Sequence, residues 1–261
     1  MLPNVWDVAS ARVIEAAGFA AIATSSAGVA FALGYPDGER IGRDEMAEAV
    51  RRIAARVRVP VTADMEAGYG RTPAAAAETA KAVIAAGAVG MNLEDAPSGE
   101  EGVLLDTALQ AERVRAAREA ARAAGIPLVI NARTDVFLAA IGAPETRLAQ
   151  AVGRLNAYRA AGADCLFAPG VCDRATLAAL VRELDGPLNV LAGAGCPAVP
   201  ELEALGVRRV SVGSGVMRAT LGLVRRVAAE LAGPGTYTSL AGDGVPTHAE
   251  VNRLMGDDPP T

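Results

Sequence analysis

One pattern of apolar and polar positions recurs along the chain. An alanine-rich stretch with helical spacing ends in a glycine, and a short apolar run follows within a few residues. The glycines at these transitions are Gly18, Gly87, Gly125, Gly162 and Gly206. A glycine after such a stretch is typical of a helix C-terminus, and a short apolar run is typical of a strand buried on both faces. The pattern therefore predicts alternating helices and strands.

Eight strands are predicted in total, because two more apolar runs follow Pro60 and Pro187 and another lies at the start of the chain. The predicted strands cover residues 2–5, 19–23, 61–63, 89–93, 128–130, 165–167, 188–191 and 209–212. Strands that alternate with helices indicate a parallel sheet, and eight such units in about 230 residues indicate an α/β fold closed as a (β/α)8 TIM barrel. The alternative is a doubly wound open sheet, but its glycine-rich first turn, GxGxxG, is absent.

The alternation stops near the end of the chain, which predicts two regions. We expect residues 1–231 to form the barrel, which carries the catalytic site, and residues 232–261 to form a C-terminal helical extension. Glycine and proline begin this extension, and a helix-like stretch follows from His248 to Met255. Such a tail is expected to pack on the barrel or on a neighbouring subunit.

Composition narrows the classes of function. The chain has 261 residues and a formal net charge of −5, so a nucleic-acid partner, which needs a basic face, is not expected. Its arginines lie on helical stretches such as residues 112–122, where alternation with alanine and glutamate indicates a solvated helix face. No apolar run reaches the roughly 18 residues of a membrane span, and the first residues show no secretory signal. We therefore expect no membrane partner and a cytoplasmic location.

Rare residue types restrict the chemistry further. Lys81 and His248 are the single lysine and the single histidine, so histidine-rich metal sites and mid-chain Ser-His-Asp triads are not expected. The cysteines Cys165, Cys172 and Cys196 contain no CxxC pair. They are expected to be free thiols of a reducing compartment and incidental to the chemistry.

Polar residues follow directly on the apolar runs, at the strand ends where barrels of this class carry their active sites. Those expected at this rim are Ser25, Ser26, Ala27, Asp64, Glu66, Asn92, Glu94, Asp95, Arg133, Asp135 and Asn189. Burying so many charges is costly unless they pair or hold a metal. Carboxylates without histidine or cysteine suit Mg²⁺, with Mn²⁺ as an alternative.

The other rim residues suit a small anionic substrate. Arg133 is able to grip a substrate carboxylate at two points, and Ser25, Ser26 and the backbone around Ala27 offer hydrogen bonds to an oxyanion. Asn189 is expected in the same substrate site. The alternative interpretation of such residues is strand-end caps and ion pairs, and a structural role is the one we expect for Asp95 and Asp135.

These residues resemble the isocitrate lyase and phosphoenolpyruvate mutase superfamily over most of the chain, from Leu2 to about Glu230. The segments that carry the resemblance are PNVWDVAS (3–10), TSSAGVA (24–30), YPD (35–37), ADMEAGYG (63–70), NLED (92–95) and NARTD (131–135). The resemblance implies a (β/α)8 barrel that binds Mg²⁺ and a small 2-oxo acid or its enolate. It also implies a homo-oligomer, usually a tetramer in which neighbours exchange the last barrel helix.

The resemblance also implies roles for individual residues. Asp64 is expected to be the metal ligand, mostly through water, and to border the substrate; Glu66 and Glu94 are expected in the same metal shell. Asp37 matches an aspartate near the metal, and with Glu94 and Arg133 it completes the expected catalytic set. The loop of Ser25, Ser26 and Ala27 matches the loop that binds the carboxylate and carbonyl of the 2-oxo acid, and Arg133 matches the substrate-binding arginine.

Three positions depart from the pattern of this superfamily. Glu66 stands where relatives commonly have aspartate. Residues 96–103 read APSGEEGV and contain neither the lysine, cysteine and histidine of the lyases nor the lysine and asparagine of the mutases. Phe167 and the three residues after it replace a glutamate of the lyases. The group that moves the proton is therefore left open, with Glu100 or Glu101 as candidates.

The expected reaction is a Mg²⁺-dependent lyase or decarboxylase reaction on a small 2-oxo or 2-hydroxy di- or tricarboxylic acid, through a metal-stabilised pyruvate enolate. Decarboxylation needs the least equipment, because CO₂ leaves without a proton. One alternative is a phosphoenolpyruvate mutase or phosphonopyruvate hydrolase-like enzyme, which the shortage of cations in residues 96–103 disfavours. Another is a barrel that binds 2-oxo acids without turnover. A third is a sugar-phosphate barrel, which glycines at residues 192–195 and 213–215 suggest.

Overall fold

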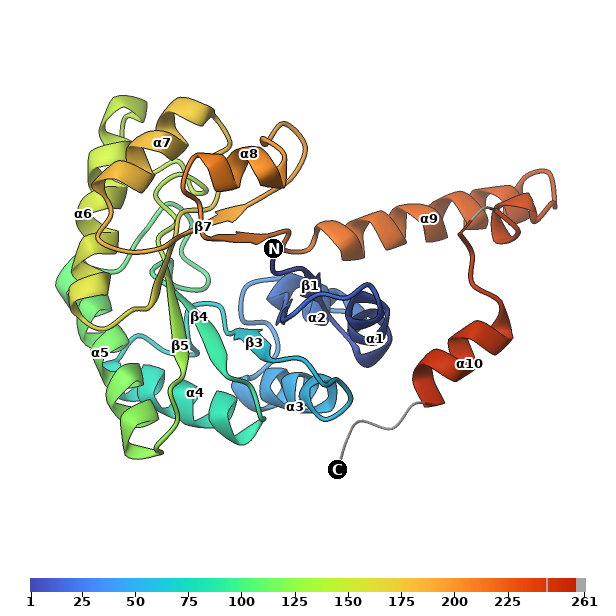
Figure 1. Cartoon of the computed structure of the whole chain (residues 1–261), viewed down its shortest axis with the longest axis horizontal. Coiled ribbons are helices and arrows are strands. Elements are labelled where there is room, and N and C mark those ends of the chain that lie inside the picture. Colours follow the sequence, from blue (N-terminus) through green and yellow to red (C-terminus); the bar gives the residue numbers. More distant parts are fainter. Residues whose placement is uncertain (243, 257–261) are drawn as a thin grey trace.

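Eight short parallel strands follow one another around a nearly closed barrel in the order β1 to β8 (Figure 1). The computed structural model describes residues 1–242 and 244–256. The strands are β1 (Asn4–Val5), β2 (Ile22–Thr24), β3 (Val61–Asp64), β4 (Gly90–Glu94), β5 (Val129–Arg133), β6 (Cys165–Phe167), β7 (Leu188–Leu191) and β8 (Arg209–Ser211). Each coincides with a predicted strand to within a few residues. The predicted TIM barrel is confirmed, and the open doubly wound sheet is excluded by the sequential strand order.

The seam between the last and the first strand is held by the start of the chain. The backbone N–H of Leu2 donates to the carbonyl of Val210 at 2.8 Å. The side chain of Asn4 accepts from the backbone N–H groups of Val212 and Gly213, both at 2.8 Å. These hydrogen bonds connect β8 to β1, between which the described residues form no strand pairing. They hold the ends of the two strands together.

The helices alternate with the strands, as the glycine pattern predicts. They are α1 (Val8–Ala16), α2 (Ser26–Ala32), α3 (Arg43–Ala54), α4 (Pro73–Ala85), α5 (Thr107–Ala123), α6 (Arg147–Ala160), α7 (Arg174–Glu183), α8 (Val199–Ala204), α9 (Gly215–Ala232) and α10 (His248–Gly256), with short 3-10 turns at Pro144–Thr146 and Thr238–Leu240. Several begin at side-chain caps, such as Asp7 on α1, Thr72 on α4 and Asp106 on α5. These caps satisfy N–H groups that a helix start leaves unpaired.

The core between sheet and helices is built from small side chains. Ala76 and Ala80 of α4 and Ala117 and Ala121 of α5 are fully buried. Alanine at these positions lets the two helices lie close together and close to the strands. The rigid layer that results holds the strand ends of β3, β4 and β5 in a fixed arrangement.

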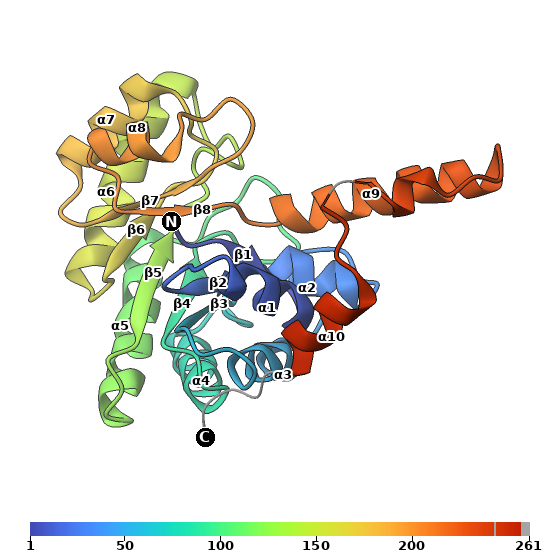
Figure 2. The ribbon, with the colours of Figure 1, turned by 45° about the vertical axis from the view of Figure 1, so that its right-hand side comes forward.

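The last barrel helix leaves the barrel. In both views α9 projects away from the strands as an arm (Figures 1 and 2), and Met217 is its one buried residue. The tail then returns, and α10 lies against α1, where Arg12 donates to the carbonyl of Leu254 at 2.8 Å. Arg56 similarly donates to the carbonyl of Met255 at 2.8 Å. Residues 257–261 of the predicted tail lie outside the described residues.

The helix faces differ from the prediction at one place. We interpreted the arginines of residues 112–122 as a solvated face, and for Arg113 and Arg118 this is wrong. Arg113 is fully buried, and the side chain of Arg118 is only 12% exposed. Both guanidinium groups bind carbonyl oxygens of neighbouring loops, which spacing along one helix does not reveal. No described helix is long and apolar enough to cross a membrane.

Candidate active site

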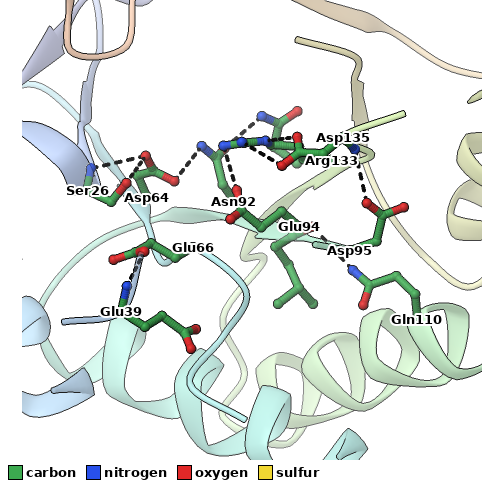
Figure 3. Close-up of polar contacts among 12 residues, drawn as sticks. Ser26, Glu39, Asp64, Glu66, Asn92, Glu94, Asp95, Gln110, Arg133 and Asp135 are labelled. Atoms are coloured by element: carbon green, nitrogen blue, oxygen red, sulfur yellow. Dashed lines mark hydrogen bonds and ion pairs between the residues drawn. The ribbon is translucent and has the colours of Figure 1, made fainter. Parts of the chain in front are cut away.

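Acidic and amide side chains meet at the C-terminal ends of neighbouring strands. Figure 3 shows Asp64, Asn92, Glu94 and Arg133 side by side at the ends of β3, β4 and β5, with Glu66 directly below Asp64. Each follows an apolar strand residue, and parallel strands bring such positions to one edge. The structure therefore brings together the central residues of the predicted site.

Asp64 is held from two sides by hydrogen bonds. Its Oδ2 accepts from the backbone N–H and the hydroxyl of Ser26 at 3.1 and 2.9 Å. Its Oδ1 accepts from the Asn92 amide at 3.1 Å, and Asn92 Oδ1 in turn accepts from the Asn131 amide at 2.7 Å. This relay of donors fixes the orientation of the carboxylate.

Glu66 is buried in an unusual backbone conformation. It is 4% exposed, and its φ of 50° lies in the left-handed region that favours glycine. Its Oε2 accepts from the backbone N–H of Glu39 at 2.5 Å, while Oε1 has no hydrogen-bond partner. Burial, with the nearby charges of Asp37, Asp64 and Glu39, raises the pKa of Glu66 to about 8. This acid is therefore poised to change protonation near neutral pH.

Glu94 and Arg133 form a largely buried pair at the ends of β4 and β5. Arg133 Nη1 lies 2.5 Å from Glu94 Oε2, but the two are not aligned as a hydrogen bond, and Oε2 has no hydrogen-bond partner. Asp135 takes two hydrogen bonds from the same guanidinium, at 2.5 and 2.8 Å. Burial raises the pKa of Glu94 despite the attraction of Arg133, and Asp135, Asp64 and Glu66 add to the increase.

Asp37 reaches the same group of acids from the loop between α2 and α3. Burial raises the pKa of Asp37, and the negative charge of Asp64 raises it further, although Gly38, Arg133 and Ser26 act in the opposite direction. This mutual influence shows that the Asp37 carboxylate shares the electrostatic environment of Asp64. The loop thus contributes one of the predicted catalytic residues.

Three predicted substrate residues have other contacts in this structure. Ser25 caps α2, since its hydroxyl accepts from the backbone N–H of Gly28 at 3.2 Å. Ala27 lies buried in the first turn of that helix. Asn189 is 1% exposed, and its amide contacts the Ser211 hydroxyl at 3.4 Å. Their contact with a substrate stays a prediction.

Asp95 has the structural contacts expected of it. It is fully buried and accepts hydrogen bonds from the hydroxyls of Thr134 and Tyr158 at 2.6 and 2.7 Å. The backbone N–H of Asp135 and the guanidinium of Arg154 also donate to it, at 3.0 and 3.2 Å. Asp95 therefore ties the end of β4 to β5 and α6.

The loop of residues 96–101 closes one side of the site. The hydroxyl of Ser98 donates to the carbonyl of Gly38 at 2.7 Å, and Glu100 pairs with Arg71 at 2.5 Å. Beneath it lies a cavity of about 350 Å³. The charged residues that line it are Asp37, Glu39, Arg40, Glu66, Glu94, Glu100 and Glu101. The cavity is therefore strongly acidic, with Arg40 as its single cation.

The side chains of the site offer the oxygen donors that a divalent metal such as Mg²⁺ prefers. Among residues 1–242 and 244–256, no three His, Cys, Asp or Glu side chains are placed to hold an ion together. If Asp64, Glu66 and Glu94 share a metal shell, as expected, they therefore contact the ion mostly through water. The buried Oε1 of Glu66 and Oε2 of Glu94 accept no hydrogen bond and fit acceptors for the water ligands of a hydrated Mg²⁺, although Glu94 Oε2 is also paired with Arg133.

Sequence reasoning missed several residues that build this site. Glu39 binds the backbone N–H of Tyr69 at 2.7 Å and supports Glu66, but it lies in a loop without a strand pattern. Asn131 belongs to the motif NARTD without a role assigned to it, and the helical spacing around Arg113 predicts a solvated side chain. The alternation of inward positions along β5 signals Asn131, because it lies two residues before Arg133.

The cysteine prediction is wrong in this structure. Cys172 and Cys196 form a disulfide with a Cα–Cα distance of 4.5 Å, and Cys165 remains a free, buried thiol. The two partners are 24 residues apart, but they lie in the loops after β6 and β7, which meet at the rim. Proximity of this kind follows from the barrel and not from local spacing, so a CxxC pattern does not reveal it.

This protein has a parallel (β/α)8 barrel with acidic side chains and one arginine at the C-terminal ends of its strands (Figure 3). These features place it in the class of TIM-barrel enzymes. Residues 1–232 match the phosphoenolpyruvate phosphomutase family, and the chain belongs to that family. The superfamily expected from the sequence motifs is thereby confirmed.

Curated relatives show the range of the family. An uncharacterized protein of Mycobacterium tuberculosis is 37% identical over 214 residues, covering 82% of this chain and 77% of that protein. Oxaloacetate decarboxylase of Rhodopseudomonas palustris is 32% identical over 215 residues, covering 80% and 71%. A Corynebacterium glutamicum protein named 2-methylisocitrate lyase 2 is 30% identical over 247 residues, covering 91% and 78%.

Solved structures agree with this placement. A Burkholderia cenocepacia J2315 protein described as a lyase/mutase has a TM-score of 0.91 at 39% identity, covering 99% of this chain and 91% of that chain. Oxaloacetate acetylhydrolase, solved with its product oxalate, has a TM-score of 0.86 at 27% identity, covering 98% and 88%. The family thus includes lyases and mutases that share this barrel.

Proposed function

We propose that this protein is a Mg²⁺-dependent lyase or decarboxylase that acts on a small 2-oxo or 2-hydroxy di- or tricarboxylic acid. The observation that carries the proposal is the group of Asp37, Asp64, Glu66 and Glu94 beside Arg133, in which Glu66 is buried, Asp64 and Glu94 are partly buried and Asp37 is exposed. So many acids around one cation leave an excess of negative charge, which a divalent cation offsets. Curated relatives named oxaloacetate decarboxylase and 2-methylisocitrate lyase support this class of reaction.

Two observations support a divalent metal in this proposal, namely the metal dependence of the superfamily and the oxygen ligands at the site. The superfamily is generally dependent on a divalent metal, and Mg²⁺ prefers oxygen ligands and keeps several waters. We propose Asp64 as its ligand, mostly through water, with Glu66 and Glu94 in the same shell through water; Mn²⁺ is the alternative ion. When bound, the ion supplies electrophilic stabilisation for the negative charge of an enolate.

Arg133 and the start of α2 are proposed to orient the substrate. Asp135 holds the guanidinium at Nε and Nη2, so Nη1, which faces Glu94, is the donor directed toward the site. A substrate carboxylate at Nη1 would compete with Glu94 for this contact. Ser25, Ser26 and the Ala27 amide are proposed to bind the 2-oxo acid carboxylate and carbonyl, and Asn189 is proposed to line the same site.

The charged residues of the site favour some of the possible reactions over others. Phosphoryl or phosphonate chemistry needs cations around a strongly anionic group. Among the described residues, the site offers Arg40, which lines this cavity, and Arg133, which is already paired with Glu94 and Asp135. Retro-aldol cleavage needs a positioned acid and base, and Glu100 is already paired with Arg71. Decarboxylation needs neither for bond cleavage, because the electron pair of the broken C–C bond stays on the organic fragment as the enolate while CO₂ leaves, and the enolate then takes a proton from water. It is therefore the first reaction to test.

A panel assay tests this proposal. Purified protein with Mg²⁺ is given oxaloacetate, 2-methylisocitrate, citramalate and phosphonopyruvate, and the formation of pyruvate and of phosphoenolpyruvate is followed. The expected result is turnover of a carboxylic acid, oxaloacetate first, which EDTA abolishes. Turnover of phosphonopyruvate alone would favour a mutase or hydrolase, and tight oxalate binding without any turnover would favour a binding barrel.

The assembly is part of the same proposal. An apolar groove of about 480 Å³ lies between α1, α2 and α3 and is lined by Trp6, Val29, Leu33 and Ile53, among others. The exposed apolar residues of α9 include Leu221, Leu223, Val224 and Leu231. We propose a homo-oligomer, a tetramer of helix-swapped pairs, in which α9 packs on a neighbour. The cytoplasmic location also stays a prediction, and the disulfide removes the argument from free cysteines.

A further inference from the structure

Arg113 is a buried cation that binds the backbone behind the site and no carboxylate of the site. It lies on α5 with no exposed surface, and its described hydrogen bonds are to carbonyl and amide oxygens rather than to a carboxylate. Nη2 donates to the carbonyls of Ala67 and of Gly70, the latter at 3.0 Å. Nη1 donates to the side chain of Gln110 and, at 3.4 Å, to the carbonyl of Glu94.

The loop that Arg113 binds has a costly backbone conformation. In residues 66–70, Glu66, Gly68, Tyr69 and Gly70 have positive φ angles of 50°, 88°, 57° and 141°. Non-glycine residues pay about 1–2 kcal/mol for such a conformation, so it persists only where surrounding contacts determine it. Arg113 therefore supplies part of the constraint that gives Glu66 its direction.

The contact between the guanidinium and this loop is close. A Cβ atom added to Gly68 would lie 3.0 Å from Arg113 Nη2 and 2.7 Å from Leu93 Cδ1. The hydroxyl of Thr79 holds the carbonyl of Gly68 at 2.7 Å. The loop is thus clamped between α4, α5 and β4 with no room for a side chain at its centre.

We propose that Arg113 is a positioning residue that fixes the Glu66 loop relative to the end of β4, where Glu94 lies. One guanidinium binds both backbone segments, so it sets the separation of two acids of the site without contacting substrate. This inference rests on the proposed function in one respect, namely that these acids serve a Mg²⁺-dependent site. Burial lowers the pKa of Arg113 to about 10, so the side chain keeps its charge at neutral pH.

The same helix offers a matched control. Arg118 also lies on α5, is 12% exposed, and donates to the carbonyl of Gly162 at 3.0 Å and that of Leu128 at 2.7 Å. It also pairs with Asp164. Leu128 and Asp164 precede β5 and β6, at the end of the strands opposite to the rim. Loss of Arg118 therefore removes a similar set of bonds without reaching the site.

The experiment compares Arg113→Lys with Arg118→Lys in two measurements. Hydrogen exchange followed by mass spectrometry reports the loop of residues 65–70, and calorimetry reports oxalate binding in the presence of Mg²⁺. For Arg113→Lys we expect faster exchange in this loop and oxalate binding weakened at least about ten-fold. For Arg118→Lys we expect faster exchange near residues 162–164 and binding within about two-fold of wild type.

The outcomes separate this inference from the proposed function. Unchanged loop exchange in Arg113→Lys would overturn the inference, as would a loosened loop with unchanged oxalate binding or an equal loss of binding in Arg118→Lys. If the wild type itself binds no oxalate, the proposed function fails, and loop exchange alone decides whether Arg113 holds the loop. Should Arg113→Lys not fold, Gln110→Met removes one acceptor of the same guanidinium and is expected to give smaller changes in the same direction.

Discussion

Glu66 combines a strained backbone, near-complete burial and an unpartnered carboxylate oxygen. Folding raises its pKa from 4.5 to about 8, so the folded protein disfavours the charged form. The stability that the protonated acid contributes is fully present below about pH 4.5 and is lost as the pH rises through 8. We therefore expect Glu66→Gln to flatten the fall in unfolding free energy of metal-free protein between pH 5 and 8.

Urea denaturation in EDTA at several pH values measures this difference. Its expected size is a few kcal/mol over that window, because each pKa unit corresponds to about 1.4 kcal/mol. Glu119→Gln, an exposed position on α5, controls for the loss of one negative charge at the surface. Equal pH dependence in wild type and Glu66→Gln would show that burial of this acid does not set the stability.

The sequence predicts the role of a site residue when that residue directly follows a predicted strand. Asp64 and Glu94 were predicted because each follows an apolar run that the barrel turns toward one rim. Glu39 and Arg113 were not, because one lies in a loop between helices and the other on a helix whose arginines all look alike in sequence. Their roles depend on contacts with residues 27 to 46 positions away, which local spacing does not encode.

At the scale of elements, the disulfide joins two rim loops that the barrel brings together. Cys172 and Cys196 close a loop of 24 residues, for which loop entropy predicts a contribution of about 3 kcal/mol. We expect Cys172→Ser to lower the unfolding free energy by about this amount under oxidising conditions, as measured by denaturant unfolding.

A reductant provides the matched control for this prediction. It should lower the stability of the wild type by a similar amount and leave Cys172→Ser unaffected. A wild type that contains three reactive thiols after denaturation without reductant would contradict the disulfide itself. Local sequence rules predicted every strand, but a bond between two loops needs the closed barrel before it is visible.

At the scale of the whole molecule, α9 projects from the barrel (Figures 1 and 2), and the rest of the described chain leaves apolar residues of this helix uncovered. The sequence predicts a helix after β8. The apolar pattern of this helix does not show whether it packs on its own barrel or on another copy of the chain. Leu221, Val224 and Leu231 lie at spacings of three and seven residues, and all are exposed, so they form one apolar face. Exposed faces of this kind mark interaction sites.

We therefore expect the wild type to be a homo-oligomer that Val224→Asp converts to smaller species, since an aspartate on this face would be buried without a partner. Size-exclusion chromatography with light scattering measures the change. Arg182→Ala, on the exposed surface of α7, is expected to leave the assembly intact. A wild type that elutes as a monomer at micromolar concentration would rule out the exchanged helix.

The central claim is that Asp64 and its neighbours bind Mg²⁺ together with a small 2-oxo acid. Isothermal titration calorimetry of oxalate into the protein, with and without Mg²⁺, tests it most directly. The account predicts binding that requires Mg²⁺, a loss of more than about 100-fold in Asp64→Ala, and unchanged binding in Asp44→Ala, whose side chain is 99% exposed. Absence of Mg²⁺-dependent oxalate binding by the wild type, or equal binding by Asp64→Ala, would contradict it.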